Sequence, residues 1–187
     1  MTLTATTPAP ATETVTPTAT TSDTTELLTN GGFEDSLNGW TAKSPTGDKV
    51  KCDKPDKQVA FEGDCAYAFK DGTAENSQII QNVDLSAVSL VTGDTFTLGG
   101  VVNAKGVVNT GIKVIVSYAD PALPKSKIKV KLKTATGGYQ PLAGELPLTG
   151  TSSAIKVQVW NKGTSGKVYY DALSLQPTTG LLPLPLP

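Results

Sequence analysis

Residues 111–118 read GIKVIVSY, and this stretch decides the fold class. Ile112, Val114, Val116 and Tyr118 share one face of it when the chain is extended. Because successive side chains of a β-strand point to opposite faces of a sheet, this period of two predicts a strand with one buried face.

Further segments of this type follow along the chain, separated by Gly, Pro, Asn and Asp. Residues 127–133 and 154–160 repeat the alternation, with Ile128, Val130 and Leu132 on one face of the first and Ile155, Val157 and Val159 on one face of the second. No segment shows the 3.6-residue period of a helix. Further strands are predicted at residues 64–70, 78–85, 94–105 and 167–175. About eight strands in about 150 residues predict an all-β fold, an antiparallel β-sandwich of jelly-roll type.

The basic residues are all lysines, which narrows the chemistry open to the chain. Sixteen lysines stand against seventeen acidic residues, for a net charge of −1, and neither Arg nor His occurs. Without histidine, Ser-His-Asp and Cys-His catalysis and His-ligated zinc are excluded. A nearly neutral chain also lacks the basic excess that nucleic-acid binding requires. The composition therefore removes most enzyme mechanisms and argues against nucleic-acid binding. An enzyme built from the remaining residues would have to use carboxylates, lysines or tyrosines, and we expect a protein that is not an enzyme.

Two segments of low complexity flank the predicted sandwich. Residues 1–25 are dominated by Thr, Ala and Pro, so they are predicted to be a linker or an extended arm. Residues 177–187, PTTGLLPLPLP, are predicted to be a second linker, because proline removes backbone donors. We therefore expect one folded module over residues 26–176, between unstructured or extended termini.

An extracellular or cell-surface location is expected from the composition of the termini. Thr/Pro tracts are typical of linkers and O-glycosylated stalks in exported proteins. Residues 1–10, MTLTATTPAP, do not resemble a signal peptide. No apolar run is long enough to predict a membrane span.

Cys52 and Cys65 are the two cysteines of the chain and lie thirteen positions apart. An even count between stalk-like flanks favours a disulfide that closes a polar loop. In the chain-entropy model such a loop stabilises by about 3 kcal/mol. The alternative is two unpaired, small apolar side chains.

The order of several short motifs resembles that of the carbohydrate-binding modules of the galactose-binding-like, jelly-roll group. The resemblance covers about residues 27–176, and its opening and closing motifs are the most specific. The motifs are NGGFE at 30–34, LNGW at 37–40, EGDCAYAF at 62–69, QIIQNV at 78–83, GDTFT at 93–97 and VYYDALSL at 168–175.

The resemblance implies a structural calcium ion that joins the first and last strands. Glu34 and Asp171 match its carboxylate positions, and backbone carbonyls near Gly63 and Asp64 are the further expected ligands. Calcium prefers six to eight hard oxygen ligands, which this set can supply. Two alternatives remain: Glu34 caps a turn while Asp171 pairs with a lysine, or the two form a glycosidase acid/base pair.

The resemblance also implies binding of polysaccharide on one sheet face, where sugar rings stack on aromatic side chains. Trp160 falls on the opposite phase from the apolar face of residues 154–160, so it points away from the core and is the first candidate platform. Tyr118, Tyr139 and Tyr169 are the next candidates. The alternative is that Trp160 covers the sheet edge or seats a neighbouring loop. The other large aromatic residues, Phe33, Trp40, Tyr67, Phe69 and Phe96, are predicted to lie in the core.

Two further motifs admit a structural and a functional interpretation. Lys125, Lys127, Lys129, Lys131 and Lys133 form a lysine-lined strand face, which either binds acidic polysaccharide or, as we favour here, keeps the strand from pairing with other chains. Residues 146–150, LPLTG, spell a cell-wall sorting pentapeptide, but a strand follows them, so we expect a coincidental loop.

The sequence therefore predicts a non-catalytic, extracellular carbohydrate-binding-like module with a structural calcium, whose partner is a polysaccharide or a cell-surface glycan. The alternative function is a structural subunit of an extracellular filament or surface layer. In that case copies of the chain would assemble through residues 1–25, added as an extended strand to a neighbour's sheet edge.

Overall fold

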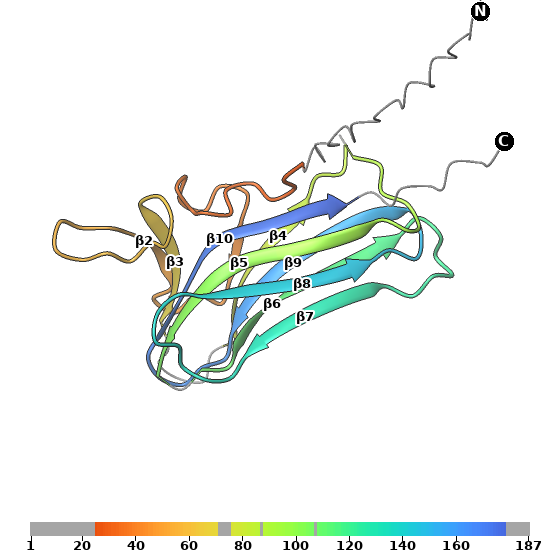
Figure 1. Ribbon diagram of the computed structural model, residues 1–187. Helices are drawn as coiled ribbons and strands as arrows, with labels where there is room; N and C mark the ends of the chain where they lie inside the picture. The colour runs from red at the N-terminus through yellow and green to blue at the C-terminus, as the bar shows by residue number, and fades with distance from the viewer. Residues whose placement is uncertain (1–24, 71–75, 87, 107, 179–187) are drawn as a thin grey trace, which may run out of the picture.

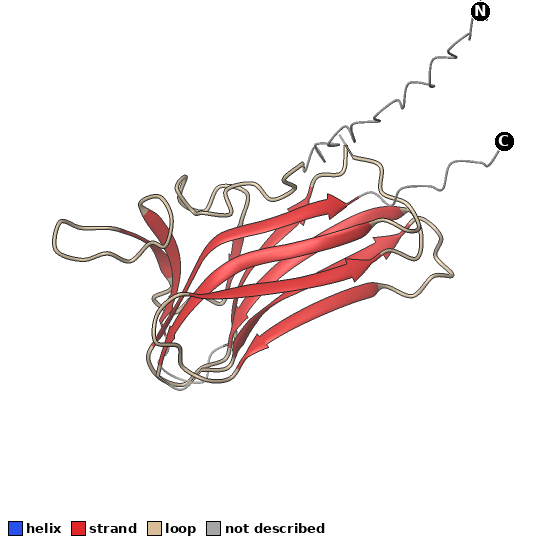
Figure 2. Ribbon diagram, in the orientation of Figure 1, coloured by secondary structure: helices blue, strands red, loops and turns tan. Residues whose placement is uncertain are grey.

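The computed structural model describes residues 25–70, 76–86, 88–106 and 108–178, which form two β-sheets packed face to face (Figure 1). The described residues contain ten strands and no helix (Figure 2). Every pair of neighbouring strands is antiparallel. The predicted all-β antiparallel sandwich is confirmed.

The first sheet has the strand order β1-β4-β9-β6-β7. Three of these strands, β6, β7 and β9, are the segments with the clearest period of two. The strands are β1 Thr41–Lys43, β4 Ser77–Val83, β9 Ser152–Asn161, β6 Thr110–Tyr118 and β7 Ser126–Leu132.

The second sheet has the strand order β2-β3-β10-β5-β8. The closing motif of the chain lies in β10, at the centre of this sheet. The strands are β2 Lys49–Cys52, β3 Cys65–Lys70, β10 Lys167–Thr178, β5 Thr95–Lys105 and β8 Gln140–Pro147.

The core lies between the two sheets, because each strand turns one face of alternating apolar side chains inward. At one end of it the rings of Phe33, Tyr67, Phe69 and Tyr170 follow one another, with centroids 5.6, 4.9 and 6.0 Å apart. All five aromatic residues predicted to lie in the core are buried there: Phe33, Trp40, Tyr67, Phe69 and Phe96.

Three strands escaped the sequence prediction. β1 and β2 are too short to show a period, and β8 contains Pro141, Gly144 and Pro147. The prolines are tolerated because β8 is an edge strand, where one row of backbone donors needs no partner. The LPLTG pentapeptide is therefore not wholly a loop, since its first two residues end β8.

The strand β10 runs two residues into the segment predicted as the second linker. Pro177 pairs with Phe96, and Thr178 pairs with Thr95. Proline fits there because β3 pairs only with residues 167–170 of β10. On the side of β10 that faces β3, no backbone N–H is therefore needed at position 177. The rest of both predicted termini, residues 1–24 and 179–187, lies outside the described residues.

Candidate functional site

The disulfide loop, residues 53–64, joins β2 to β3 at one end of the second sheet (Figure 1). Cys52 and Cys65 are directly opposite one another in the register of the two strands and form a disulfide bond. The predicted pairing is confirmed. The bond closes the base of the loop. Three carboxylates that accept hydrogen bonds from loop N–H groups, and one tyrosine that donates to a loop carbonyl, fix its interior.

Asp53 organises the first part of this loop. Its Oδ1 accepts hydrogen bonds from the backbone N–H groups of Val59 and Ala60, at 2.6 and 2.9 Å. These two hydrogen bonds hold the pKa of Asp53 below its usual value, and the bond from Ala60 has the larger effect. The ionised Asp53 carboxylate therefore fixes the turn that leads into Phe61.

Asp171 anchors the same loop from β10. It lies on the outer face of the second sheet, has no solvent exposure, and its Oδ2 accepts hydrogen bonds from the backbone N–H groups of Phe61 and Glu62 at 2.7 and 3.2 Å. The next residue, Ala172, has a φ of 47° and begins a β-bulge against β5. Such a bulge changes the direction of neighbouring side chains. Here it directly follows Asp171, whose carboxylate binds the loop.

Glu34 completes the attachment from the opening motif. Its Oε1 accepts hydrogen bonds from the backbone N–H groups of Asp64 and Cys65, at 3.0 and 2.9 Å. Gly63 has a φ of 63°, and a Cβ there would lie 2.4 Å from Oε1 of Glu34. Only glycine fits this approach, so the loop is shaped around the carboxylate.

The structure thus brings all four predicted metal-site residues, Glu34, Gly63, Asp64 and Asp171, to one loop. Burial raises the pKa of Asp171 and the Glu34 charge adds to this shift, although three backbone hydrogen bonds oppose it. A shallow hollow of about 410 Å³ adjoins them, lined by Gly32, Glu34, Glu62, Gly63 and Ala172. Among the described residues, no three Asp, Glu, His or Cys side chains cluster to hold a metal by themselves.

A second hollow, of about 340 Å³, lies on the outer face of the second sheet, between the disulfide loop and the segment before β8. Tyr169 of β10 and Asn103 of β5 are directly paired and form its floor. Phe61 and Tyr139 contribute the aromatic walls. We call it the aromatic hollow; Lys57, Gln58, Val59, Ala60, Lys105 and Gly138 complete its lining.

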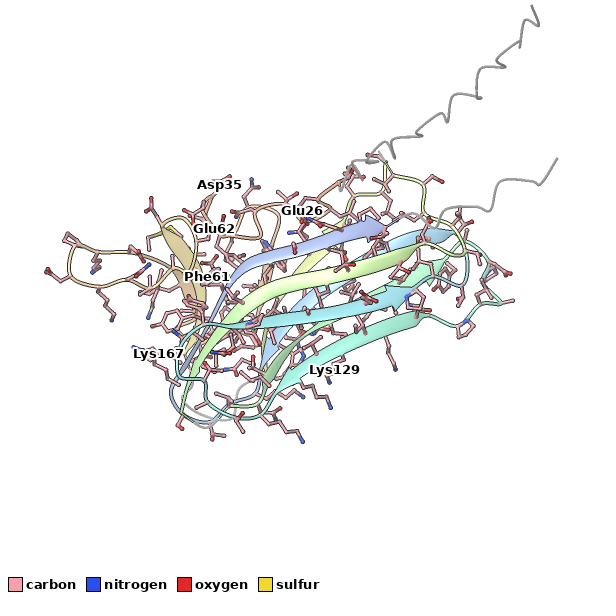
Figure 3. All side chains as sticks on the ribbon, viewed as in Figure 1. Glu26, Asp35, Phe61, Glu62, Lys129 and Lys167 are labelled. Atoms are coloured by element: carbon pink, nitrogen blue, oxygen red, sulfur yellow. A yellow bond between two sulfur atoms is a disulfide. The ribbon has the colours of Figure 1, made fainter. Side chains whose placement is uncertain are left out.

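The rings of the aromatic hollow differ in accessibility. Phe61 is 53% exposed, and its ring centroid lies 5.5 Å from that of Tyr139, with the planes at 59° (Figure 3 labels Phe61). Tyr139 donates a hydrogen bond to the carbonyl of Val59, and burial raises its pKa. Tyr169 is only 5% exposed, with Nζ of Lys51 5.9 Å from its ring centroid. Phe61 and Tyr139 therefore provide the open apolar surface.

Asn103 supplies a polar group at the floor of this hollow. Its Oδ1 is shielded from solvent and accepts no hydrogen bond from the described part of the chain. A buried carbonyl oxygen without a donor is costly, by about 1–3 kcal/mol. A hydroxyl group of a ligand is a donor of the type that Oδ1 lacks.

The remaining predicted platform residues lie elsewhere. Trp160 faces outward from the first sheet as predicted, but it is 6% exposed, and Nζ of Lys129 lies 4.7 Å from its ring centroid. Tyr118 is buried in the core, where its hydroxyl donates to Oγ of Ser126 at 2.6 Å. The four predicted residues thus do not form one site; only Tyr139 and Tyr169 come together.

Phe61 and Asn103 were missed by the sequence analysis. Phe61 lies in a loop, where periodicity carries no information, and Asn103 is a polar position on a strand's outer face. The available signal was the presence of one aromatic residue in a mostly polar segment between two cysteines. A single exposed ring is common on protein surfaces, so this signal becomes informative only once the structure shows the ring of Tyr139 beside it.

Comparisons with known proteins agree with this fold. No protein-family model and no curated protein matches the chain. Among solved structures, a family 16 carbohydrate-binding module aligns with a TM-score of 0.57 and 18% identity, over 80% of this chain and 98% of that module. A family 61 module in complex with β-1,4-galactotriose aligns with a TM-score of 0.55 and 20% identity, over 81% of this chain and 97% of that one.

Two further structures show how widely this fold is used. A xylan-binding family 22 module from Paenibacillus barcinonensis aligns with a TM-score of 0.60 and 12% identity, over 84% of this chain and 97% of that one. A cyclase from Fischerella aligns with a TM-score of 0.62 and 14% identity, over 85% of this chain and 100% of that one. The chain therefore has the jelly-roll sandwich of carbohydrate-binding modules, a fold that enzymes also use.

Proposed function

We propose that the chain is a non-catalytic carbohydrate-binding module that holds a glycan in the aromatic hollow. The observation that carries this proposal is the pairing of the exposed ring of Phe61 with Tyr139, above a floor of Tyr169 and Asn103. Sugar rings present C–H faces that pack on aromatic surfaces, and their hydroxyls need hydrogen-bond partners. The hollow offers both kinds of contact at one place.

The absence of histidine and arginine from the chain supports a binding role over a catalytic one. Glu34 and Asp171 are the pair considered as a glycosidase acid and base, but both accept hydrogen bonds from backbone N–H groups of the disulfide loop. Their oxygens hold the loop in place. The described residues that line the aromatic hollow are lysines and neutral residues, with no carboxylate among them.

We also propose that Glu34 and Asp171 bind a structural calcium ion. The donor set fits a hard cation, because the two carboxylates lie near enough for the Glu34 charge to raise the pKa of Asp171. Oε2 of Glu34 accepts no hydrogen bond from the described residues, so it is available to a cation. Gly63 and Asp64 lie against the same carboxylate. When bound, calcium would neutralise two negative charges that otherwise repel one another across the loop.

An extracellular or cell-surface location is part of this proposal. A disulfide bond persists in an oxidising compartment, and Cys52–Cys65 supports such a location. The described residues form no helix that is long and apolar enough to cross a membrane. A polysaccharide outside the cell is then the natural partner of the hollow.

Affinity gel electrophoresis with a panel of neutral polysaccharides, including β-1,4-galactan and xylan, tests the proposed function. We expect at least one of them to retard the wild-type protein. Tyr139→Ala should abolish that retardation because the ring is lost. Tyr139→Phe, which removes only the hydroxyl that bonds Val59, should keep most of it. A wild-type protein that no polysaccharide retards would contradict the proposal.

The alternative function, a filament or surface-layer subunit assembled through residues 1–25, stays a prediction, because almost all of that segment lies outside the described residues. Deletion of residues 1–25 should leave the sandwich folded and prevent any polymer. Electron microscopy of the full-length and shortened proteins decides this point.

A further inference from the structure

The outer face of the first sheet is unusually one-sided in charge. Its five strands carry six lysines and no Asp or Glu, although the whole chain has a net charge of −1. Lys129 projects from β7 on the side of the sandwich opposite Glu26, Asp35 and Glu62 (Figure 3). We call this surface the lysine face; it consists of Lys43, Lys113, Lys127, Lys129, Lys131 and Lys156.

The strand register arranges these lysines in adjacent rows. Lys129 is directly opposite Lys113, and that row continues through Gln158 of β9. The row on one side runs from Lys127 through Ile115 to Lys156. The row on the other side runs from Lys131 to Lys43, by way of Gly111, Trp160 and Gln78. Rows two residues apart are about 7 Å from one another, so the charges form a regular grid on the sheet.

Protection of the edge strand β7 accounts for only part of this pattern. Lysines on an edge strand discourage pairing with other chains, but Lys113 and Lys156 lie on β6 and β9, inside the sheet. Lys113 and Lys129 are directly opposite one another, and like charges in this arrangement destabilise a sheet. Burial lowers the pKa of Lys129, and the charges of Lys131, Lys113, Lys162 and Lys127 lower it further. The fold therefore maintains a repulsion that an anionic partner would relieve.

Trp160 lies within the lysine face and contacts one of its lysines. Its ring lies under the ammonium group of Lys129, a cation–π contact that positions the charge. Trp160 is 94% shielded, yet its Nε1–H donates no hydrogen bond within the described part of the chain. A buried donor without an acceptor is unusual in a folded protein, and an ordered water or ion beneath Lys129 would satisfy it.

We propose that the lysine face binds an anionic polysaccharide, a chain with repeating carboxylate or sulfate groups. A regular grid of one charge matches an extended polymer that repeats the opposite charge. A nucleic acid fits less well, because the chain has no arginine and the ring of Trp160 is covered, so bases have no aromatic surface to stack on. A protein partner fits less well, because the face lacks an exposed apolar anchor. This site is independent of the aromatic hollow, which lies on the other sheet.

Affinity gels that contain dextran sulfate test this proposal. Gels with polygalacturonate and with unsulfated dextran are run in parallel, and each is repeated at increasing salt concentration. Dextran sulfate and polygalacturonate should retard the wild-type protein and dextran should not. The variant Lys113→Gln/Lys129→Gln/Lys131→Gln should bind at least about tenfold more weakly, because it loses three charge contacts. The matched control, Lys49→Gln/Lys54→Gln/Lys70→Gln, has the same net charge and should bind within about twofold of wild type.

Several results would overturn the proposal: no retardation of the wild-type protein, equal losses in both triple variants, or equal retardation by single-stranded poly(dT). Self-association of the wild type in sedimentation, lost in the first triple variant, would instead assign the face to contacts between copies. Retardation by a neutral polysaccharide should be unchanged in the first triple variant, so this test and the test of the aromatic hollow succeed or fail separately. The melting temperatures of both variants confirm that they fold.

Discussion

The backbone N–H of Phe61 donates a hydrogen bond of 2.7 Å to Oδ2 of Asp171, a residue 110 positions later in the chain. The carboxylate proposed to bind calcium therefore also positions the most exposed aromatic ring of the aromatic hollow. Glu34 holds the far end of the same loop. Binding of the metal and binding of the glycan should consequently be coupled through residues 53–64.

Calcium should raise the melting temperature. A ligand that binds only the folded state, at 100 times its Kd, stabilises by about 2.7 kcal/mol, or roughly 5–10 °C for a module of this size. We expect this difference between melts in calcium and in chelator. Glu34→Gln should abolish it, whereas Glu145→Gln, an exposed carboxylate on β8, should retain it. Identical melts with and without chelator would rule out a structural ion.

The same calcium should strengthen glycan binding. Without the ion, repulsion between Glu34 and Asp171 loosens the loop that carries Phe61. We therefore expect chelator to weaken retardation by the preferred polysaccharide, and calcium to restore it. If chelator lowers the melting temperature but leaves retardation unchanged, the loop does not couple the two sites.

The calcium effect should depend on pH in a defined direction. Burial raises the pKa of Asp171 above its ordinary value, which is about 3.9. In chelator this group therefore favours the fold at low pH, and that contribution is lost as the pH rises through the raised pKa. Calcium binds the ionised form of Asp171. The stabilisation of the fold by calcium should therefore appear as the pH rises through the same range. Melting curves in calcium and in chelator should therefore differ at neutral pH and converge as the pH is lowered through the raised pKa of Asp171. A calcium effect that is as large in acid as at neutral pH contradicts the assignment.

The sequence predicted the parts of the fold that depend on local patterning. Period-two alternation placed β6, β7 and β9 correctly, because their buried faces are continuous. It missed β8, where Gly144 replaces an inward side chain: a Cβ there would lie 2.3 Å from Cδ1 of Ile128. A sequence pattern does not report that close approach between strands of different sheets.

The candidate site was less predictable because long-range contacts assemble it. Nothing near Phe61 in sequence indicates that Asp171 fixes its loop or that Tyr139 meets its ring. The outward direction of Trp160 was predicted correctly from its phase, but its exposure was not. Lys129 from β7 covers the ring, and that neighbour depends on strand order.

Loss of the disulfide should affect binding more than folding. The bond closes a loop at one end of the second sheet, while the core lies between the sheets. Cys52→Ser/Cys65→Ser should lower stability by about 3 kcal/mol, or roughly 6–12 °C in melting temperature. The variant should stay folded, and its glycan affinity should fall because Phe61 is less well positioned. Unchanged affinity would show that the hydrogen bonds of Asp53 and Asp171 suffice.

Replacement of Trp160 should destabilise the sandwich without changing binding of a neutral glycan. Because the ring is 6% exposed, Trp160→Ala should cost about 3 kcal/mol, whereas Trp160→Phe should cost less. Thermal melts and affinity gels measure the two effects separately. Loss of neutral-glycan binding by both variants, with little change in stability, would restore Trp160 as the platform.

Retention of Phe61→Ala on the preferred neutral polysaccharide, compared with Val91→Ala, tests the central claim most directly. Phe61 and Val91 are the exposed large apolar residues among those described, at 53% and 45% exposure, so either truncation should leave the core intact. If the aromatic hollow holds the sugar, Phe61→Ala should weaken binding about tenfold, the effect of roughly 1.4 kcal/mol of stacking, and Val91→Ala should bind like wild type. Wild-type affinity in Phe61→Ala would contradict the account.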